Sequence, residues 1–133
     1  MTFLVDTDWV VDSLTGLDLA RDLFLQLLPA GAAISIISYI EIMEGIVGER
    51  DPERANAVFR AFLREVDVLG INEAVATKTA LIRADLRRQG RSINHRAMDL
   101  LIAATAVDNG LILVSRNTRH YDDISDLRLY AFS

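Results

Sequence analysis

Residues 97–115 decide the fold of this chain, and they read AMDLLIAATAVDNGLILVS. Apolar residues occupy nearly every face of the segment Ala97–Asn109, which predicts a buried helix that stops at Gly110. The short, mostly apolar run Leu111–Ser115 follows at once and predicts a buried strand. A buried helix that leads into a buried strand is typical of an α/β protein, in which helices cover a mostly parallel sheet.

The same alternation of strands and helices continues on both sides of this segment. The predicted strands are Thr2–Asp6, Ala32–Ile37, Val66–Gly70 and a possible fifth, Arg128–Phe132. The predicted helices are Leu17–Leu28, closed by Pro29, Ser38–Val47, with Ser38 as N-cap, a helix from Asp51 to about Glu65, and a helix from Asn72 to about Gln89. This order again predicts an α/β fold with a mostly parallel sheet.

Composition sets broad limits on the class of protein. A chain of 133 residues suits one domain, 1–133, and its 51% hydrophobic and 25% charged residues are typical of a globular protein. It contains no cysteine, which excludes thiol redox chemistry and cysteine-bound metal. No apolar run approaches the ~20 residues that span a bilayer, and no targeting segment is visible. We therefore expect a cytoplasmic protein without a membrane segment.

The charge is unevenly distributed. A net charge of −5 argues against a nucleic-acid partner. However, residues 1–70 contain twelve acidic residues and five arginines, whereas residues 83–119 contain seven arginines and three aspartates. Arginine binds phosphate in a bidentate manner and stacks on bases. The alternative is a solvated helix face with ordinary ion pairs.

Asp6 and the Ser115–Asn117 turn each follow a predicted strand. In open parallel sheets the active site lies beyond the carboxyl ends of the strands, so both positions are candidates for function. The alternative for Asp6 is an N-cap, a role for which Thr7 and Asp8 are rivals. The alternative for the second segment is an ordinary polar turn.

Two further acids stand on predicted helices. Glu41 fits a capping box with Ser38, and Glu44 is a rival for any metal role because it lies near the same helix face. Asp99 belongs to the strongly apolar helix, where a carboxylate is costly to bury unless it is paired or binds metal. Its alternative is a helix-start acid that interacts with the helix dipole.

The candidate positions are Asp6, Glu41, Asp99 and Asn117, with Ser115 beside Asn117. Successive members of this set are 35, 58 and 18 residues apart, so they meet only if the fold brings them together. Oxygen ligands without cysteine or a histidine cluster select a hard cation, Mg²⁺ or Mn²⁺. The two histidines, His95 and His120, stand in polar surroundings and are expected on the surface.

Four segments in order resemble the PIN-domain family, and in particular the VapC-type toxins of toxin–antitoxin pairs. They are Leu4–Asp8, Ile37–Gly45, Asp99–Ala106 and Leu113–Tyr121, and together they extend the resemblance over essentially the whole chain. The resemblance implies a PIN-like, three-layer α/β/α fold with a central, mostly parallel sheet of four to five short strands.

The resemblance also assigns roles to residues. It implies that Asp6, Glu41 and Asp99 are the metal-binding acids of a Mg²⁺- or Mn²⁺-dependent endoribonuclease. Asn117 matches a fourth position that is often Asp in the family, and Ser115 matches a small hydroxyl residue that helps to position a water or metal. Three arginines lie nearest the motifs and are the candidates for phosphate contact: Arg96, Arg116 and Arg119.

Partners follow from the same resemblance. A toxin of this kind would have an RNA substrate and a small cognate antitoxin whose tail covers the acidic pocket. It would commonly form a homodimer, for which Leu17–Leu28 or Val58–Leu63 could supply apolar residues.

Other functions remain open. They are a nuclease of the same fold that acts on DNA or in RNA processing, and a non-catalytic binding module. A receiver-like phosphoacceptor domain is also α/β, but that class needs an acceptor Asp after the third strand and a late strand-end lysine. Here the third strand ends in Leu69-Gly70-Ile71, with no acid, and Lys78 is the single lysine.

Overall fold

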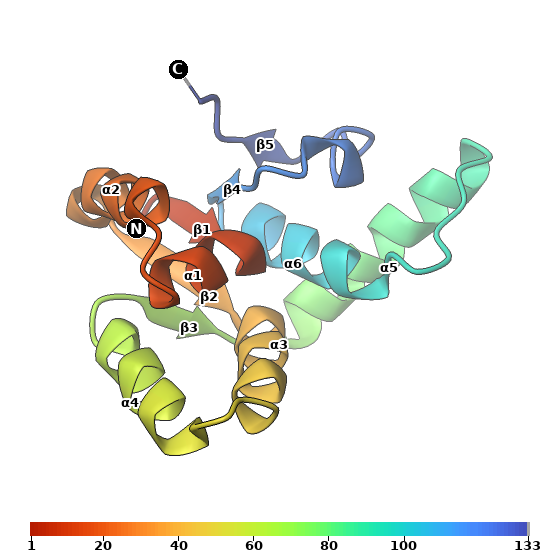
Figure 1. Ribbon diagram of the computed structural model, residues 1–133. Helices are drawn as coiled ribbons and strands as arrows, with labels where there is room; N and C mark the ends of the chain where they lie inside the picture. The colour runs from red at the N-terminus through yellow and green to blue at the C-terminus, as the bar shows by residue number, and fades with distance from the viewer. Residues whose placement is uncertain (133) are drawn as a thin grey trace.

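A computed structural model describes residues 1–132, and its centre is a parallel sheet of five strands (Figure 1). The strands are β1 (Phe3–Val5), β2 (Ala32–Ser35), β3 (Asp67–Leu69), β4 (Ile112–Val114) and β5 (Arg128–Leu129). They lie in the order β3-β2-β1-β4-β5, and each neighbouring pair is parallel. The predicted strands are therefore confirmed, but each is shorter than expected. Ile36 and Ile37, predicted as the end of the second strand, begin the helix that follows it.

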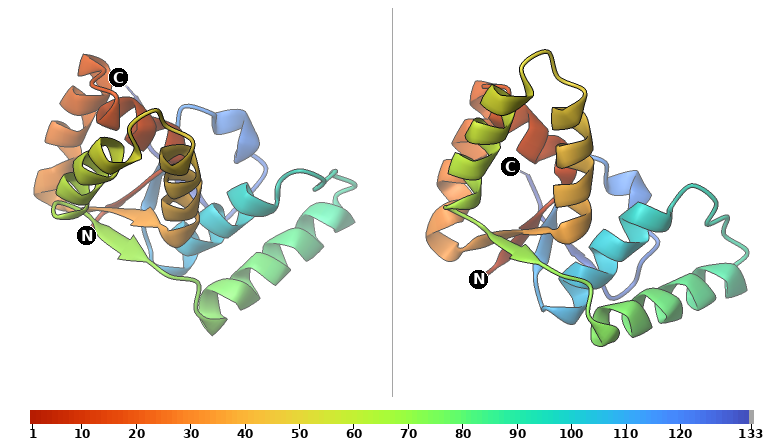
Figure 2. Two further views of the ribbon diagram at one scale, coloured as in Figure 1. Left: turned by 60° about the horizontal axis from the view of Figure 1, so that its bottom comes forward. Right: turned by 90° about the horizontal axis from the view of Figure 1, so that it is seen from below.

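Helices cover both faces of this sheet. They are α1 (Thr7–Leu14), α2 (Asp18–Leu27), α3 (Ile36–Val47), α4 (Pro52–Leu63), α5 (Glu73–Arg88) and α6 (Ala97–Asp108), with short 3-10 turns η1 (Leu28–Ala30) and η2 (Thr118–His120). Figure 2 shows α5 and α6 on one side of the sheet and α1, α2 and α4 on the other. The predicted three-layer α/β/α architecture is confirmed.

Alternating strand residues divide the core between the two faces. Leu4 and Leu113 pack with α5 and α6, whereas the next residues, Val5 and Val114, pack with α1, α2 and α4. Successive side chains of a strand point to opposite faces, so a strand that is apolar at both positions requires cover on both sides. This is why the strands read as short continuous apolar runs.

The strand order creates a switch point beside β1. The chain proceeds from β1 to β2 and β3 in one direction and then places β4 and β5 on the other side of β1. Val5 is in register with Val114, and the amide of Asp6 continues the pairing by donating to the Val114 carbonyl at 2.9 Å. Asp6 and Ser115 therefore leave neighbouring strands at the place where open α/β sheets bind ligands.

The start of α3 differs from the prediction. Ser35, not Ser38, is the N-cap, and its Oγ accepts a hydrogen bond from the Ile37 amide at 3.0 Å. The helix begins three residues earlier because the last residue of β2 already supplies the cap. Helix α1 was not predicted, although Asp6 was considered as its N-cap. None of the helices within residues 1–132 is both long and apolar enough to cross a membrane.

The packing of α6 leads to a test of the core. Leu100 is fully buried, whereas its neighbour Leu101 is only partly buried. Leu100→Ala should lower the free energy of unfolding by about 2–5 kcal/mol, since it removes buried methyl groups and leaves a cavity. Leu101→Ala is the matched control and should cost clearly less in urea denaturation. Equal losses in the two variants would contradict the assigned orientation of α6.

Candidate active site

Asp6 is the buried centre of the candidate site, with 7% of its surface exposed. Its Oδ1 accepts a hydrogen bond from the Thr7 amide at 2.9 Å, which makes it the N-cap of α1. Its Oδ2 accepts from the hydroxyls of Ser115, at 2.8 Å, and Tyr121, at 3.2 Å. Burial raises the pKa of Asp6, these hydrogen bonds oppose the rise, and the charge of Asp99 adds to it. Asp6 therefore both caps α1 and lies at the centre of the candidate site.

Asp99 approaches Asp6 from the first turn of α6. Its Oδ1 lies 3.3 Å from the Tyr121 hydroxyl, the same hydroxyl that contacts Asp6. Its Oδ2 lies 3.2 Å from Nδ1 of His120, and its side chain is 30% exposed. The structure therefore joins two of the predicted acids through one tyrosine. His120 is exposed, as expected, yet its ring borders the site.

Glu41 reaches the same region from α3. It is the sixth residue of a helix capped by Ser35, too far from the helix start to close a capping box, so the capping interpretation is wrong. The Thr7 hydroxyl oxygen lies 2.8 Å from both Glu41 Oε1 and Ser38 Oγ. Because a carboxylate only accepts, the single hydroxyl proton of Thr7 is directed to Glu41. Partial burial of the carboxylate raises the pKa of Glu41, the Thr7 hydrogen bond opposes the rise, and the charges of Asp6, Asp99 and Asp8 add to it.

Ser115 and Asn117 lie at the predicted strand end but make different contacts. Ser115 is buried; its Oγ donates to Asp6 and accepts from the Asn117 amide at 3.0 Å. The Asn117 side chain instead donates through Nδ2 to Asp8 Oδ2 at 2.8 Å. The structure thus places Ser115 directly on the central carboxylate and places Asn117 on an acid of α1.

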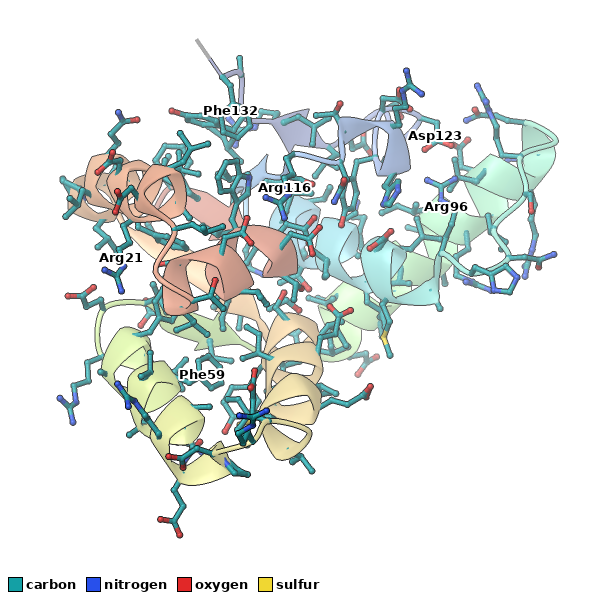
Figure 3. All side chains as sticks on the ribbon, viewed as in Figure 1. Arg21, Phe59, Arg96, Arg116, Asp123 and Phe132 are labelled. Carbon is teal, nitrogen blue, oxygen red and sulfur yellow. The ribbon has the colours of Figure 1, made fainter. Side chains whose placement is uncertain are left out.

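Arg96 is held in a bidentate ion pair. Its two terminal nitrogens donate to the Asp123 carboxylate at 2.7 and 2.8 Å, and one also donates to the His120 carbonyl at 2.9 Å (Figure 3). The pKa of Asp123 is lowered, chiefly by these hydrogen bonds from Arg96. A phosphate contact by Arg96 would have to compete with this pair.

The other two predicted phosphate contacts differ from each other. Arg116 pairs with Asp12 and lies over the Trp9 ring, with its guanidinium carbon 5.5 Å from the ring centroid. Arg119 is exposed on η2. Arg119 is therefore the member of the predicted set whose position is most open to a substrate.

Sequence reasoning missed several functional contacts. Thr7 and Asp8 follow Asp6 directly and were considered only as rival caps, and Tyr121 lay in the last resembling segment without a role. Adjacency to Asp6 was the available signal for the first two. Nothing local marks Tyr121, because its partners stand 115 and 22 residues away.

The residues fit a hard divalent cation. All the candidate ligand atoms are carboxylate, hydroxyl or side-chain amide oxygens, the ligand type of Mg²⁺ and Mn²⁺. Within residues 1–132, no arginine or lysine forms an ion pair with Asp6, Glu41 or Asp99, so their charges are not cancelled by a basic side chain. In the same part of the chain, no three His, Asp or Glu side chains are already drawn together as a ready-made metal-binding set. The acids are close enough to raise one another's pKa, but their carboxylates do not converge on one point closely enough to form a ready-made metal site.

Comparison with known proteins agrees with this geometry. The family model described as the PIN domain matches residues 3–126. This chain belongs to the PIN domain family. A relative from Shigella flexneri, the tRNA(fMet)-specific endonuclease VapC, is 40% identical over 71% of this chain and 70% of its own.

Two solved structures extend the likeness over nearly the full length. A chain in the structure of DNA-bound VapBC from Salmonella typhimurium has a TM-score of 0.86 and 28% identity, covering 98% of this chain and 97% of its own. A chain in a toxin-antitoxin complex from Klebsiella pneumoniae has a TM-score of 0.72 and 25% identity, covering 98% and 100%. The prediction of a VapC-type PIN domain is confirmed.

The raised pKa of Asp6 leads to a test by pH. In the folded, metal-free protein Asp6 retains a proton above its ordinary pKa of 3.8, which the unfolded chain has already released. Its contribution to stability is therefore present at low pH and is lost as the pH rises through the raised pKa. Asp6→Asn keeps the N-cap and removes this titration. We expect the melting temperature of Asp6→Asn to fall less than that of the wild type as the pH rises from about 4 to about 7.

The measurement is thermal unfolding with a chelator present. Asp123 does not affect the comparison of melting temperatures, because its pKa is lowered. Its contribution to stability is lost only as the pH falls below the ordinary range of an aspartate. Identical pH profiles for the two proteins would show that Asp6 is not an uncompensated buried acid.

Proposed function

We propose that this chain is a Mg²⁺- or Mn²⁺-dependent endoribonuclease that hydrolyses RNA phosphodiester bonds and acts as the toxin of a toxin–antitoxin pair. The observation that carries the proposal is the group of three acids, Asp6, Glu41 and Asp99, at the carboxyl edge of the sheet with no basic side chain of residues 1–132 paired to them except His120. Relatives named as VapC endonucleases support it. The matched residues 3–126 also support treating 1–133 as one PIN domain.

Each residue of the site has a distinct task in this proposal. Asp6, Glu41 and Asp99 hold the cation, with Asn117 as a further candidate ligand. When bound, such a cation neutralises the phosphate and promotes ionisation of an attacking water. Ser115 fixes one oxygen of Asp6 by donating a hydrogen bond to Oδ2, which also accepts from Tyr121. Oδ1 accepts only from the Thr7 amide, so a lone pair on Oδ1 stays available for a cation.

The choice of RNA as substrate rests on the relatives, because the same metal chemistry cleaves either nucleic acid. The tRNA(fMet)-specific endonuclease VapC supports RNA cleavage by this chain. The position of Arg119 beside His120 supports a phosphate contact near Asp99. A cleavage assay with DNA in place of RNA tests the alternative, a DNA nuclease of the same fold.

A protein partner is the second part of the proposal. An apolar groove of about 400 Å³ lies between α1, α3 and α4 and reaches Glu41 at one end. A segment of an antitoxin that occupied this groove would also cover Glu41. The toxin-antitoxin complex from Klebsiella pneumoniae supports such a partner. The homodimer predicted through Leu17–Leu28 or Val58–Leu63 stays a prediction.

Loss of one ligand tests the catalytic assignment. Asp99→Asn should reduce RNA cleavage by at least ~100-fold, because a neutral amide cannot replace a central metal-binding charge. Glu44→Gln is the matched control; Glu44 lies exposed one turn beyond Glu41, and its change should leave the rate unaltered. Circular dichroism confirms folding of both. A folded Asp99→Asn variant with the wild-type rate would remove Asp99 from the mechanism.

Alanine variants of Arg96, Arg116 and Arg119 distinguish an arginine that binds RNA from one that stabilises the fold through an ion pair. Arg119→Ala should weaken RNA binding and flatten the log–log salt dependence by roughly 0.7 for a single strand. Arg96→Ala should chiefly lower stability, because it leaves the half-buried Asp123 without its partner. Arg116→Ala should fall between these effects, since it breaks the pair with Asp12.

The binding series is measured in the Asp99→Asn background, so that RNA remains intact. Arg64→Ala removes the same charge from an exposed position at the end of α4 and serves as the control. If Arg119→Ala and Arg64→Ala gave the same affinity and slope, Arg119 would not contact phosphate.

A further inference from the structure

Tyr121 is a buried residue whose hydroxyl lies between two acids of the candidate site. Its side chain is 1% exposed and packs in the core beneath α5 and α6. The hydroxyl oxygen is 3.2 Å from Asp6 Oδ2 and 3.3 Å from Asp99 Oδ1. A phenol has one proton to donate, so a single donor is shared between two acceptors of like charge.

The chemistry of this phenol makes it a permanent donor. The ordinary pKa of a tyrosine hydroxyl is about 10. The hydroxyl therefore keeps its proton throughout the physiological range. Both contacts are longer than the 2.5–2.7 Å typical of a hydroxyl that donates to one carboxylate. The single hydroxyl proton is therefore within reach of both acids.

The backbone that carries Tyr121 is fastened to the helix that carries Asp99. Arg96 donates to the carbonyl of His120, just before Tyr121, and to the carboxylate of Asp123, two residues after it. Arg96 is also the residue that precedes α6, three positions before Asp99. The Arg96 clamp, defined as these bonds to His120 and Asp123, thus fixes Tyr121 relative to Asp99.

We propose that Tyr121 is a positioning residue whose hydroxyl sets the separation of Asp6 and Asp99 and so prepares both carboxylates for one divalent cation. The inference rests on the proposed function, since it assigns a role within that metal site. It also gives Arg96 a task different from the phosphate contact predicted from sequence: Arg96 acts through Tyr121.

Electrostatics explains why such a residue is needed. Asp99 is 30% exposed, so repulsion from the buried Asp6 favours turning its carboxylate out toward water. A donor shared by both acids lowers this repulsion and keeps the two groups facing a common point. Groups that orient metal ligands in this way typically change metal affinity by 10–100-fold.

The experiment removes the hydroxyl and keeps the ring. Tyr121→Phe is compared with Tyr130→Phe, which removes the same group from a tyrosine that packs on Phe3 across the sheet, away from the acids. Mn²⁺ is titrated by calorimetry into the wild type and both variants. We expect Tyr121→Phe to weaken Mn²⁺ binding at least ~10-fold and Tyr130→Phe to leave it unchanged.

A second measurement separates positioning from direct catalysis. The RNA cleavage rate of Tyr121→Phe should recover to within a few-fold of wild type at saturating Mn²⁺, with half-saturation at a higher Mn²⁺ concentration. Asp123→Asn, which loosens the Arg96 clamp, should weaken Mn²⁺ binding in the same direction and add little when combined with Tyr121→Phe.

Each outcome has a defined meaning. Equal Mn²⁺ affinity of Tyr121→Phe and wild type overturns the inference and leaves the proposed function standing. Equal weakening in both phenylalanine variants also overturns it, because the effect would then come from packing. A wild-type protein that binds no Mn²⁺ overturns the proposed metal site itself, and this inference with it.

Discussion

The burial of a charged carboxylate at the end of the central strand governs the arrangement of the whole site. Asp6 is removed from water, and such a group is costly unless several donors reach it. Those donors come from three separate segments: the Thr7 amide at the start of α1, Ser115 after β4, and Tyr121 after η2. Parallel pairing of β1 with β4 is what brings them to one point. A slip of one residue in that register would turn Ser115 to the other face of the sheet.

The donors to Asp6 are all neutral, and this has a chemical consequence. Basic groups lie nearby, yet Arg96 is occupied by Asp123 and Arg116 by Asp12. The protein therefore satisfies the hydrogen bonding of Asp6 without cancelling its charge. An arginine in place of these hydroxyls would cancel the charge of Asp6 and remove the reason for a cation to bind. Burial raises the pKa of Asp6, so the fold keeps this charge available at a cost in free energy.

The sequence was sufficient for the fold because the decisive signals are local. Apolar runs located the strands, and the apolar segment that begins near Asp99 identified the buried helix. It also located Asp6 and Ser115, since both follow a strand directly. It misassigned the cap of α3 because Ser38 and Glu41 match a capping box, while Ser35 had already supplied the cap. A short pattern does not show which of two serines stands at the end of the strand.

The side-chain partners could not be predicted for a related physical reason. Arg96 was judged by its closeness to a motif, but its partner Asp123 is 27 residues away in sequence. Tyr121 gained its role only when the sheet placed Asp6 beside it. Which acid an arginine selects, and where a hydroxyl points, depend on distances that tertiary packing sets. Composition and spacing limit such choices without deciding them.

One continuous chain of hydrogen bonds connects the three acids. Glu41 accepts from the Thr7 hydroxyl, the Thr7 amide donates to Asp6, and Asp6 and Asp99 share the proton of Tyr121. Each residue between two acids contributes only neutral hydrogen-bond donors. These hydrogen bonds can therefore hold the acids near one another without neutralising their charge. Since Thr7 belongs to α1 and Tyr121 follows η2, the spacing of the acids is set by elements from both ends of the sequence. The site is therefore a property of the assembled fold, and the residues that hold the acids near one another are as much a part of it as the acids.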